Sequence, residues 1–404
     1  MSSTVYNAPV EAARLQRLGL IVGVAGLVIL AFGALIGREQ FWRSYLTGYL
    51  FWLGIAVGAL ALLMLQHLTG GGWGMVIRRP LEAATRTLPL MFVLFLPLLL
   101  GMHSLYEWTH HEVLEAHPAL KEKARFLNPA FFSVRAVLYF AVWMVLAFFL
   151  NRWSREQDLT AERQFQKNMR VLSGPGLVLF VLTVTFAAID WVMSLDPAWS
   201  STIFGLLFVA AWGLSALSFS VAVLAWLSKR EPMSHVAAPL HFHDLGKLLL
   251  ALVMLWAYFA YSQFLIIWSG NLPEEIRWYL PRTRGAWGGI ALAVVILHFA
   301  VPFLFLLSRR LKRNPNKLVL VAVFILIMRY VDLLWVVAPN FSHEAFHVSW
   351  MDLVSPVGFG GVWLATFFWQ LRQRPVMPIN DPQFPSVLEQ AHSQHGDEFI
   401  DETA

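Results

Sequence analysis

The sequence predicts an all-α integral membrane protein that crosses the bilayer ten times. Of its 404 residues, 58% are apolar and only 14% are charged, and the mean hydropathy is +0.59. A water-soluble domain of this length needs far more polar surface than this composition supplies. The formal net charge of +5 comes from Lys and Arg in short segments between apolar runs, where they set topology. It therefore gives no reason to expect nucleic acid as a partner.

Ten apolar runs are each long enough to span a membrane. A helix needs about 20 apolar residues to cross the hydrocarbon core, because it rises about 1.5 Å per residue. Segments containing Gly, Asn or Pro separate many of the runs, as at Asp196-Pro197 and Asn314-Pro315. The predicted spans cover residues 18–37, 44–66, 85–106, 129–151, 173–195, 201–227, 247–269, 286–307, 317–338 and 350–371.

The distribution of Lys and Arg orients these spans. If the N-terminus is cytoplasmic, 20 of the 30 Lys and Arg residues lie in cytoplasmic segments and eight lie on the opposite side. Positive residues favour the cytoplasmic side, so we expect both termini there. The chain then divides into a cytoplasmic segment (1–17), a transmembrane domain (18–371) and a polar, acidic cytoplasmic tail (372–404). Because residues 375–404 contain no Lys or Arg, we expect the tail to be extended.

Five ionisable residues fall well inside the predicted spans, away from the span ends. A charge in the middle of a bilayer costs at least about 2.5–3.5 kcal/mol, so such residues usually face a protein interior and belong to a functional path. This pattern indicates a membrane protein that handles protons, ions or a polar ligand. The five residues are Arg135, Asp190, His298, Arg329 and Asp332.

The predicted orientation gives each of these groups a depth. Asp190 falls in the outer third of its span, Arg329 near the middle, and His298 at the centre of the eighth span. A histidine can take up and release protons near physiological pH, so we predict two polar half-paths that meet at His298. The outer half-path comprises Arg135, Asp190, Arg329, Asp332, His103, Tyr261 and Gln263, and the cytoplasmic half-path begins at Glu82, Asp244 and Lys247.

A structural interpretation of the same residues stays open. Arg329 and Asp332 are three residues apart, so they can neutralise one another on one helix face. Asp190 can pair with Arg135 in the same way between two helices. The sequence does not separate a proton path from a scaffold, because both require satisfied buried charges.

The chain contains no cysteine. Iron–sulfur clusters, c-type haem attachment and thiolate zinc sites all need cysteine, so they are excluded within this chain. We expect no cofactor and no metal bound by this chain. His241 and His243 have a metal-like spacing, but they begin a helix in which Asp244 is a natural first-turn residue.

Three stretches resemble a known family. They are FAAIDWVMSLDPAWSSTIFG at 186–205, HDLGKLLLALVMLWAYFAYSQFLIIWSGNLPEEIRWYLP at 243–281, and Met-Arg-Tyr-Val-Asp-Leu at 328–333. The chain resembles the second NrfD-like membrane subunit of bacterial alternative complex III, a quinol:electron acceptor oxidoreductase. The resemblance implies two four-helix bundles, at about 44–195 and 201–338, flanked by the first and last helices.

The resemblance also implies a location and partners. It implies the bacterial inner membrane, with lipids around the chain, and a sister NrfD-like subunit that holds the better supported quinol site. It further implies an iron–sulfur protein and multihaem cytochrome c subunits, with a terminal oxidase as a further candidate partner. Iron–sulfur clusters, c-type haems and quinone are then expected on those partner subunits.

The leading hypothesis is a membrane subunit without redox centres that conducts protons, coupled to quinol oxidation in the sister subunit. One alternative is a quinol site in this chain, which needs a base within hydrogen-bond reach of the ring hydroxyl. A second is an independent secondary transporter, although no broken-helix substrate site is evident. A third is a purely structural membrane scaffold.

Overall fold

The computed structural model describes residues 6–110, 112, 118–341, 346–389, 391 and 393. Over these residues, ten helical runs are long and apolar enough to cross a membrane, which confirms the predicted all-α membrane fold. Six runs are single helices: α1 (Glu11–Ile36), α2 (Arg38–Thr69), α8 (Pro129–Thr160), α10 (Phe204–Leu227), α11 (Pro239–Gly270) and α18 (Trp350–Leu371). A seventh, α17 (Pro315–Val337), continues into a short turn that ends at Asn340.

The other three spans are interrupted or extended. The third span joins α3 (Gly72–Thr85) to α4 (Leu88–Leu100), and the fifth continues from α9 (Arg163–Trp191) into a short turn, η3 (Met193–Leu195). The eighth combines α14 (Gly285–Ala293), the π-helical segment η5 (Val294–Ala300) and α15 (Val301–Leu307). The connecting helices are α5 (Met102–Leu105), η2 (Glu107–Thr109), α7 (Pro118–Lys123), η4 (Met233–His235), α12 (Pro273–Ile276), α13 (Leu280–Thr283), α16 (Arg309–Arg313) and η6 (Ala338–Asn340).

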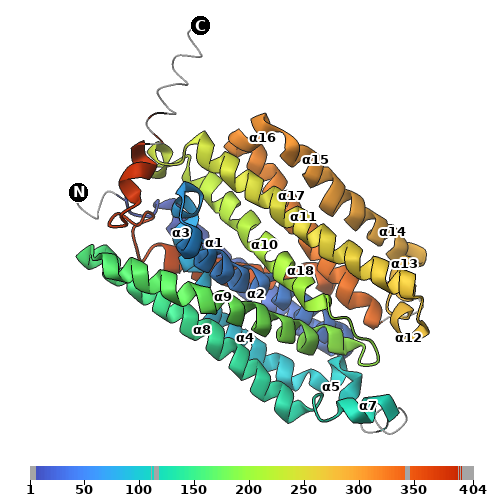
Figure 1. The fold of residues 1–404 in the computed structure, drawn as a ribbon. Helices are drawn as coiled ribbons and strands as arrows, with labels where there is room; N and C mark the ends of the chain where they lie inside the picture. The colour runs from blue at the N-terminus through green and yellow to red at the C-terminus, as the bar shows by residue number, and fades with distance from the viewer. Residues whose placement is uncertain are drawn as a thin grey trace.

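The first and last spans begin and end on the same side of the bundle. We call this side the terminal end, and the side that carries α5, α7 and α12 the distal end (Figure 1). Glu11 at the start of α1 pairs with Arg230 beyond α10 at 3.5 Å, and Gln16 accepts from Arg372 beyond α18 at 2.8 Å. Residues 111 and 113–117, in the loop before α7, lie outside the described residues.

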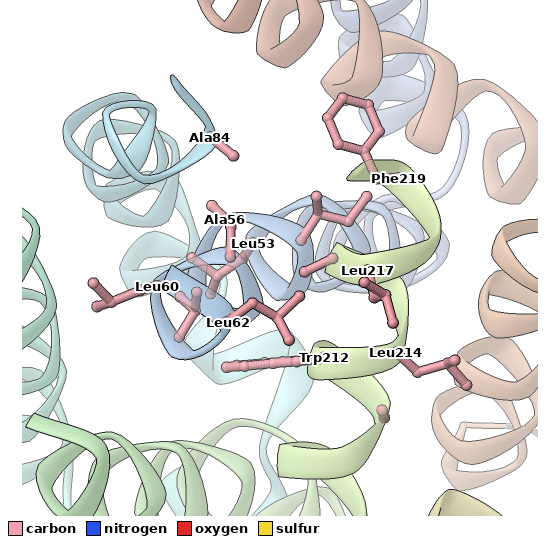
Figure 2. Close-up of a cluster of buried hydrophobic side chains, with 14 of the residues drawn as sticks. Leu53, Ala56, Leu60, Leu62, Ala84, Trp212, Leu214, Leu217 and Phe219 are labelled. Carbon is pink, nitrogen blue, oxygen red and sulfur yellow. The ribbon is translucent and has the colours of Figure 1, made fainter. Parts of the chain in front are cut away.

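Helices α2 and α10 form the centre of the molecule. Figure 2 shows Trp212 and Leu217 of α10 packed beside α2, on the side of Leu62, whereas Leu60 points to the opposite side of α2. The two helices approach closely at Gly58, where an added Cβ would lie 2.1 Å from the Trp212 carbonyl oxygen. Small residues permit such backbone proximity in membranes, where close van der Waals contact replaces the hydrophobic effect as the driving force.

The remaining helices group on either side of this centre. One group contains α3, α4, α8 and α9, which contact α2 and one another; the other contains α11, α15, α17 and η5, arranged around α10 and one another. We call these groups, with α2 and α10 respectively, the first and second bundles. Helices α1 and α18 lie together, with an added Cβ on Gly361 only 2.3 Å from the Gly23 backbone nitrogen.

The first part of the tail is not extended, so this prediction is wrong for residues 376–389. Val376, Phe384 and Val387 are buried, and Val376 donates its backbone N–H to the Tyr6 carbonyl at 2.7 Å. Asp381 forms a buried ion pair with Arg78 at 2.6 Å. Apolar residues placed between the polar ones therefore attach this segment to the terminal end of the bundle.

Candidate functional site

The first buried ion pair joins two helices of the first bundle. Arg135 on α8 donates to both oxygens of Asp190 on α9, through Nε at 2.8 Å and Nη2 at 2.7 Å. The Tyr139 hydroxyl donates to Asp190 Oδ2 at 2.7 Å, and Arg135 Nη1 donates to the Phe126 carbonyl at 2.9 Å. A bidentate pair with these additional bonds has little unused hydrogen-bonding capacity. We therefore assign it to holding α8 against α9.

The second ion pair lies within a single helix of the second bundle. Arg329 Nη1 donates to Asp332 Oδ2 one turn further along α17, and both side chains are buried. Arg329 Nε is buried without a hydrogen-bond partner among the described residues. This pair neutralises charge along one helix, and it leaves part of its hydrogen-bonding capacity unused.

His298 lies beside the second pair and is completely buried. Within the part of the chain that the structure describes, neither ring nitrogen has a hydrogen-bond partner. The imidazole meets the Trp256 ring edge to face, with 4.3 Å between ring centroids. Arg329 is close enough for its charge to act on the imidazole. We call Trp256, His298, Arg329 and Asp332 the His298 cluster.

The local sequence explains why the helix is distorted around His298. Pro302 lies four residues later, and its ring nitrogen cannot donate the α-helical hydrogen bond that the His298 carbonyl would accept. The helix widens here into the π-helical segment Val294–Ala300. Segments of this kind are frequent at functional sites, because they displace a side chain from its regular helical position.

The His298 cluster combines the groups that proton transfer requires. A neutral imidazole carries one nitrogen that can accept a proton and one that can donate it. Asp332 supplies a carboxylate, and Arg329 supplies a fixed positive charge beside it. The described residues contain no group of three His, Cys, Asp or Glu side chains arranged to hold an ion.

Several predicted residues lie away from this cluster at the distal end. Tyr261 is 63% exposed on the outer surface of α11, so it does not join the interior group. His103 is also exposed, with its ring 3.9 Å from that of His110. Gln263 is buried, accepts from Ser201 at 3.0 Å and donates to Tyr279 at 3.3 Å. The outer residues therefore do not converge on one path.

Glu82 is enclosed at the terminal end. It accepts from Arg78 Nε at 3.0 Å, from Arg79 Nη1 at 2.6 Å and from Ser154 at 2.6 Å. Arg374 of the tail is within 3.4 Å of the same carboxylate, and burial lowers the pKa of Arg374 although Glu82 acts in the opposite direction. Because Glu82 is buried and accepts from both arginines and from Ser154, we assign it to attaching α3, α8 and the tail.

Asp244 and Lys247 form a partly exposed pair at the terminal end of α11. Lys247 Nζ donates to Asp244 Oδ1 at 2.9 Å, and the Lys247 side chain is largely in solvent. Leu249 and Val253 follow on the same helix and are fully buried. Solvent thus reaches the predicted cytoplasmic residues, but apolar side chains lie along α11 between them and Trp256.

Sequence reasoning missed four contributors. Tyr139 and Trp256 complete the two clusters, yet nothing in an apolar run separates them from the other aromatic residues. Arg43 and Asp352 form a buried pair at 2.8 Å between α2 and α18, reinforced by Ser44 Oγ, which donates to Asp352 at 2.6 Å. Both lie near predicted span ends, where charged residues usually reach water. The His298–Pro302 spacing was the one signal available for the π-helical segment.

Comparison with known protein families and with curated proteins finds no match to this chain.

Proposed function

We propose that this chain is a membrane subunit without redox centres in a bacterial respiratory quinol:electron acceptor oxidoreductase, and that it conducts protons. The observation that carries the proton role is His298, which is buried in a distorted helix and has no hydrogen-bond partner for either ring nitrogen among the described residues. Leaving a buried polar group unsatisfied costs about 1–3 kcal/mol. A residue with that cost inside a membrane span is best explained by function.

The proposed route passes through the second bundle. Asp332 lies nearer the distal end of α17 than Arg329 does and exchanges protons between His298 and that end. From the terminal end, protons pass from the Asp244–Lys247 pair to His298 along water molecules that enter past the side chains of Leu249 and Val253. The π-helical segment supports this step, because such segments are frequent at functional sites.

The redox part of the proposal rests on the family resemblance. The sister NrfD-like subunit would oxidise quinol, and an iron–sulfur protein and a multihaem cytochrome c would carry the electrons. The chain would lie in the inner membrane with both termini cytoplasmic. Affinity purification of the tagged full-length chain from mildly solubilised native membranes should retain haem and iron–sulfur subunits. Recovery of the chain alone, still folded and functional, would overturn the assignment to a complex.

A matched pair of aromatic substitutions tests the proton role. His298→Phe removes two unpaired nitrogens, so the free energy of unfolding should rise by about 1–3 kcal/mol while quinol-driven proton release falls. Tyr139→Phe removes a hydrogen bond to Asp190, so stability should fall by about 1.5–3 kcal/mol while proton release per electron is unchanged. Both variants would be measured in the purified complex, reconstituted into liposomes that contain a pH-sensitive dye.

The comparison has a clear negative outcome. If His298→Phe retains the wild-type number of protons released per electron, His298 is not a relay and the proton proposal fails. Electron transfer from quinol to the acceptor, measured in detergent, serves as the control for intact assembly. A loss of electron transfer in both variants to the same extent would indicate damage to assembly and would favour the scaffold interpretation.

A cavity favours a second function, quinol binding within this chain. The cavity has a volume of about 340 Å³, lies at the distal end and is lined by Gln263, Ile266 and Glu275 among others. Asp190 is not free to act as a base there, since Arg135 and Tyr139 use its oxygens. Glu275 is the carboxylate that lines the cavity. Glu275→Gln should reduce labelling by a photoreactive quinone if this function is present, and unchanged labelling would exclude it.

A further inference from the structure

A second cavity lies at the terminal end, on the opposite side of the membrane from the 340 Å³ cavity lined by Gln263 and Glu275. It has a volume of about 300 Å³ and lies between the end of α2 and the beginning of α9. Its lining includes His67 and Gly70 from the α2 end and Gln383 from the folded part of the tail. Leu68, Thr69 and Gln166 also line it, and its charged side chains are all basic: Arg163, Lys167 and Arg170, from the first two turns of α9.

All charged side chains that line this cavity are positive. Arg163, Lys167 and Arg170 are spaced four and three residues apart, which puts them on one helix face. No ion pair joins any of them to another described residue, and no acidic residue lines the cavity. The nearby Arg78 and Arg79 are instead each paired with Glu82. The cavity therefore presents positive charge that the surrounding protein does not neutralise.

Two further features indicate an anion. His67 Nε2 is buried and has no hydrogen-bond partner among the described residues, although its side chain lines the cavity. The cavity also lies at the N-terminus of α9, a 29-residue helix whose N-cap residue, Glu162, makes no capping hydrogen bond and does not line the cavity, and whose first turn has no acidic residue. The helix dipole and the free backbone N–H groups of such a terminus favour a negative ligand.

An apolar strip leads from the basic residues into the membrane. Val171, Val178 and Leu182 follow Arg170 on α9, and all three side chains are exposed in the chain alone. Gly174 lies between them and has open space where a side chain would be. This strip lies at the depth of lipid acyl chains, directly beyond the cavity that favours an anion.

We propose that this cavity binds the phosphate headgroup of an anionic phospholipid, whose acyl chains lie along the apolar strip of α9. Arg163, Lys167 and Arg170 would contact the phosphate oxygens, and His67 Nε2 and the Gln383 amide would donate hydrogen bonds to the headgroup. Basic pockets between transmembrane helices bind anionic headgroups through this chemistry. A free phosphate offers the same oxygens, but it would leave the apolar strip unused.

The test measures lipid binding to the full-length chain in two charge-matched variants. The first variant is Arg163→Gln/Lys167→Gln/Arg170→Gln. The control is Arg309→Gln/Arg310→Gln/Lys317→Gln, which removes three exposed positive charges from the same end but away from the cavity. In phosphatidylcholine nanodiscs titrated with phosphatidylglycerol, we expect the first variant to bind about 100-fold more weakly and the control to match the wild type. All six side chains are exposed, so neither variant should unfold.

Three other outcomes would overturn the proposal. Equal losses in both variants would show that only the general surface charge attracts lipid, and equal retention in both would show that the cavity binds none. Competition by inorganic phosphate at concentrations that leave the control unaffected would identify a free-phosphate site and reject the lipid. Lys167→Glu provides a second, single substitution, and it should weaken binding more than Lys317→Glu does.

Discussion

The two bundles contain the same kind of buried pair, but they use it differently. In the first bundle, Arg135 and Asp190 lie on different helices, and Tyr139 and the Phe126 carbonyl complete their hydrogen bonding. In the second, Arg329 and Asp332 lie on one helix, and the neighbouring His298 has no hydrogen-bond partner in the described structure.

Whether a buried charged group has all its hydrogen-bond partners distinguishes a structural role from a functional one better than its charge does. A satisfied pair between helices supports the fold, because removing either member leaves the other charge buried. An incompletely satisfied group adds no such support and costs stability, so its presence points to another use. We therefore expect changes to the Arg135–Asp190 pair to destabilise the fold. Changes to the His298 cluster should instead reduce function.

The largest effect is expected at Asp190. Asp190→Asn leaves the Arg135 guanidinium buried without a carboxylate, which should destabilise the protein by about 3–5 kcal/mol. Thermal unfolding in detergent and the yield of folded protein would show this loss. The control is Asp196→Asn, because Asp196 pairs with a half-exposed Arg277 at 3.3 Å and should contribute only about 0–1 kcal/mol. Similar stabilities for the two variants would show that the Arg135–Asp190 pair does not hold the fold.

A smaller effect is expected when both members of a pair are made apolar. Arg329→Met/Asp332→Leu should change stability by less than about 1.5 kcal/mol, because a buried ion pair can often be replaced by apolar residues of similar volume. Arg135→Met/Asp190→Leu should cost about 2 kcal/mol or more, because the Tyr139 hydroxyl and the Phe126 carbonyl lose their partners. Chemical denaturation would measure both values. Equal costs would contradict the distinction between the two bundles.

Much of the fold was predictable because the membrane imposes simple rules. Span length and hydropathy located all ten helices, but not where they end. The fourth span was predicted to end at residue 151, whereas α8 continues to Thr160. A helix does not have to stop at the edge of the hydrocarbon, and beyond it polar residues such as Gln157 remain helical by contacting other parts of the protein. The polar composition also predicted an extended tail, whereas a few buried apolar residues are enough to fold its first part onto the bundle.

The site was only partly predictable, because pairing depends on tertiary position. The five buried ionisable residues were found because a charge in the bilayer costs free energy. The three-residue spacing of Arg329 and Asp332 also predicted that they pair with each other. The sequence could not show that Trp256 rather than another of the 18 Trp residues faces His298. Nor could it show that Glu82, at a predicted surface, is enclosed by two arginines. Such contacts join residues distant in the chain, and helical periodicity says nothing about them.

The smallest effect is expected at Pro302, which tests the cause of the distortion beside His298. Pro302→Ala supplies an N–H that can donate to the His298 carbonyl, so the segment should become more regularly α-helical and gain about 0.5–1.5 kcal/mol. Amide hydrogen exchange over residues 294–300 should slow. Pro315→Ala is the control, because Pro315 begins α17, where the first N–H groups have no helical partner. If the π-helical segment positions His298 for proton transfer, Pro302→Ala should also reduce proton release, although less than His298→Phe. A variant with slowed exchange and unchanged proton release would separate the helix distortion from the relay, leaving His298 itself as the functional element of the second bundle.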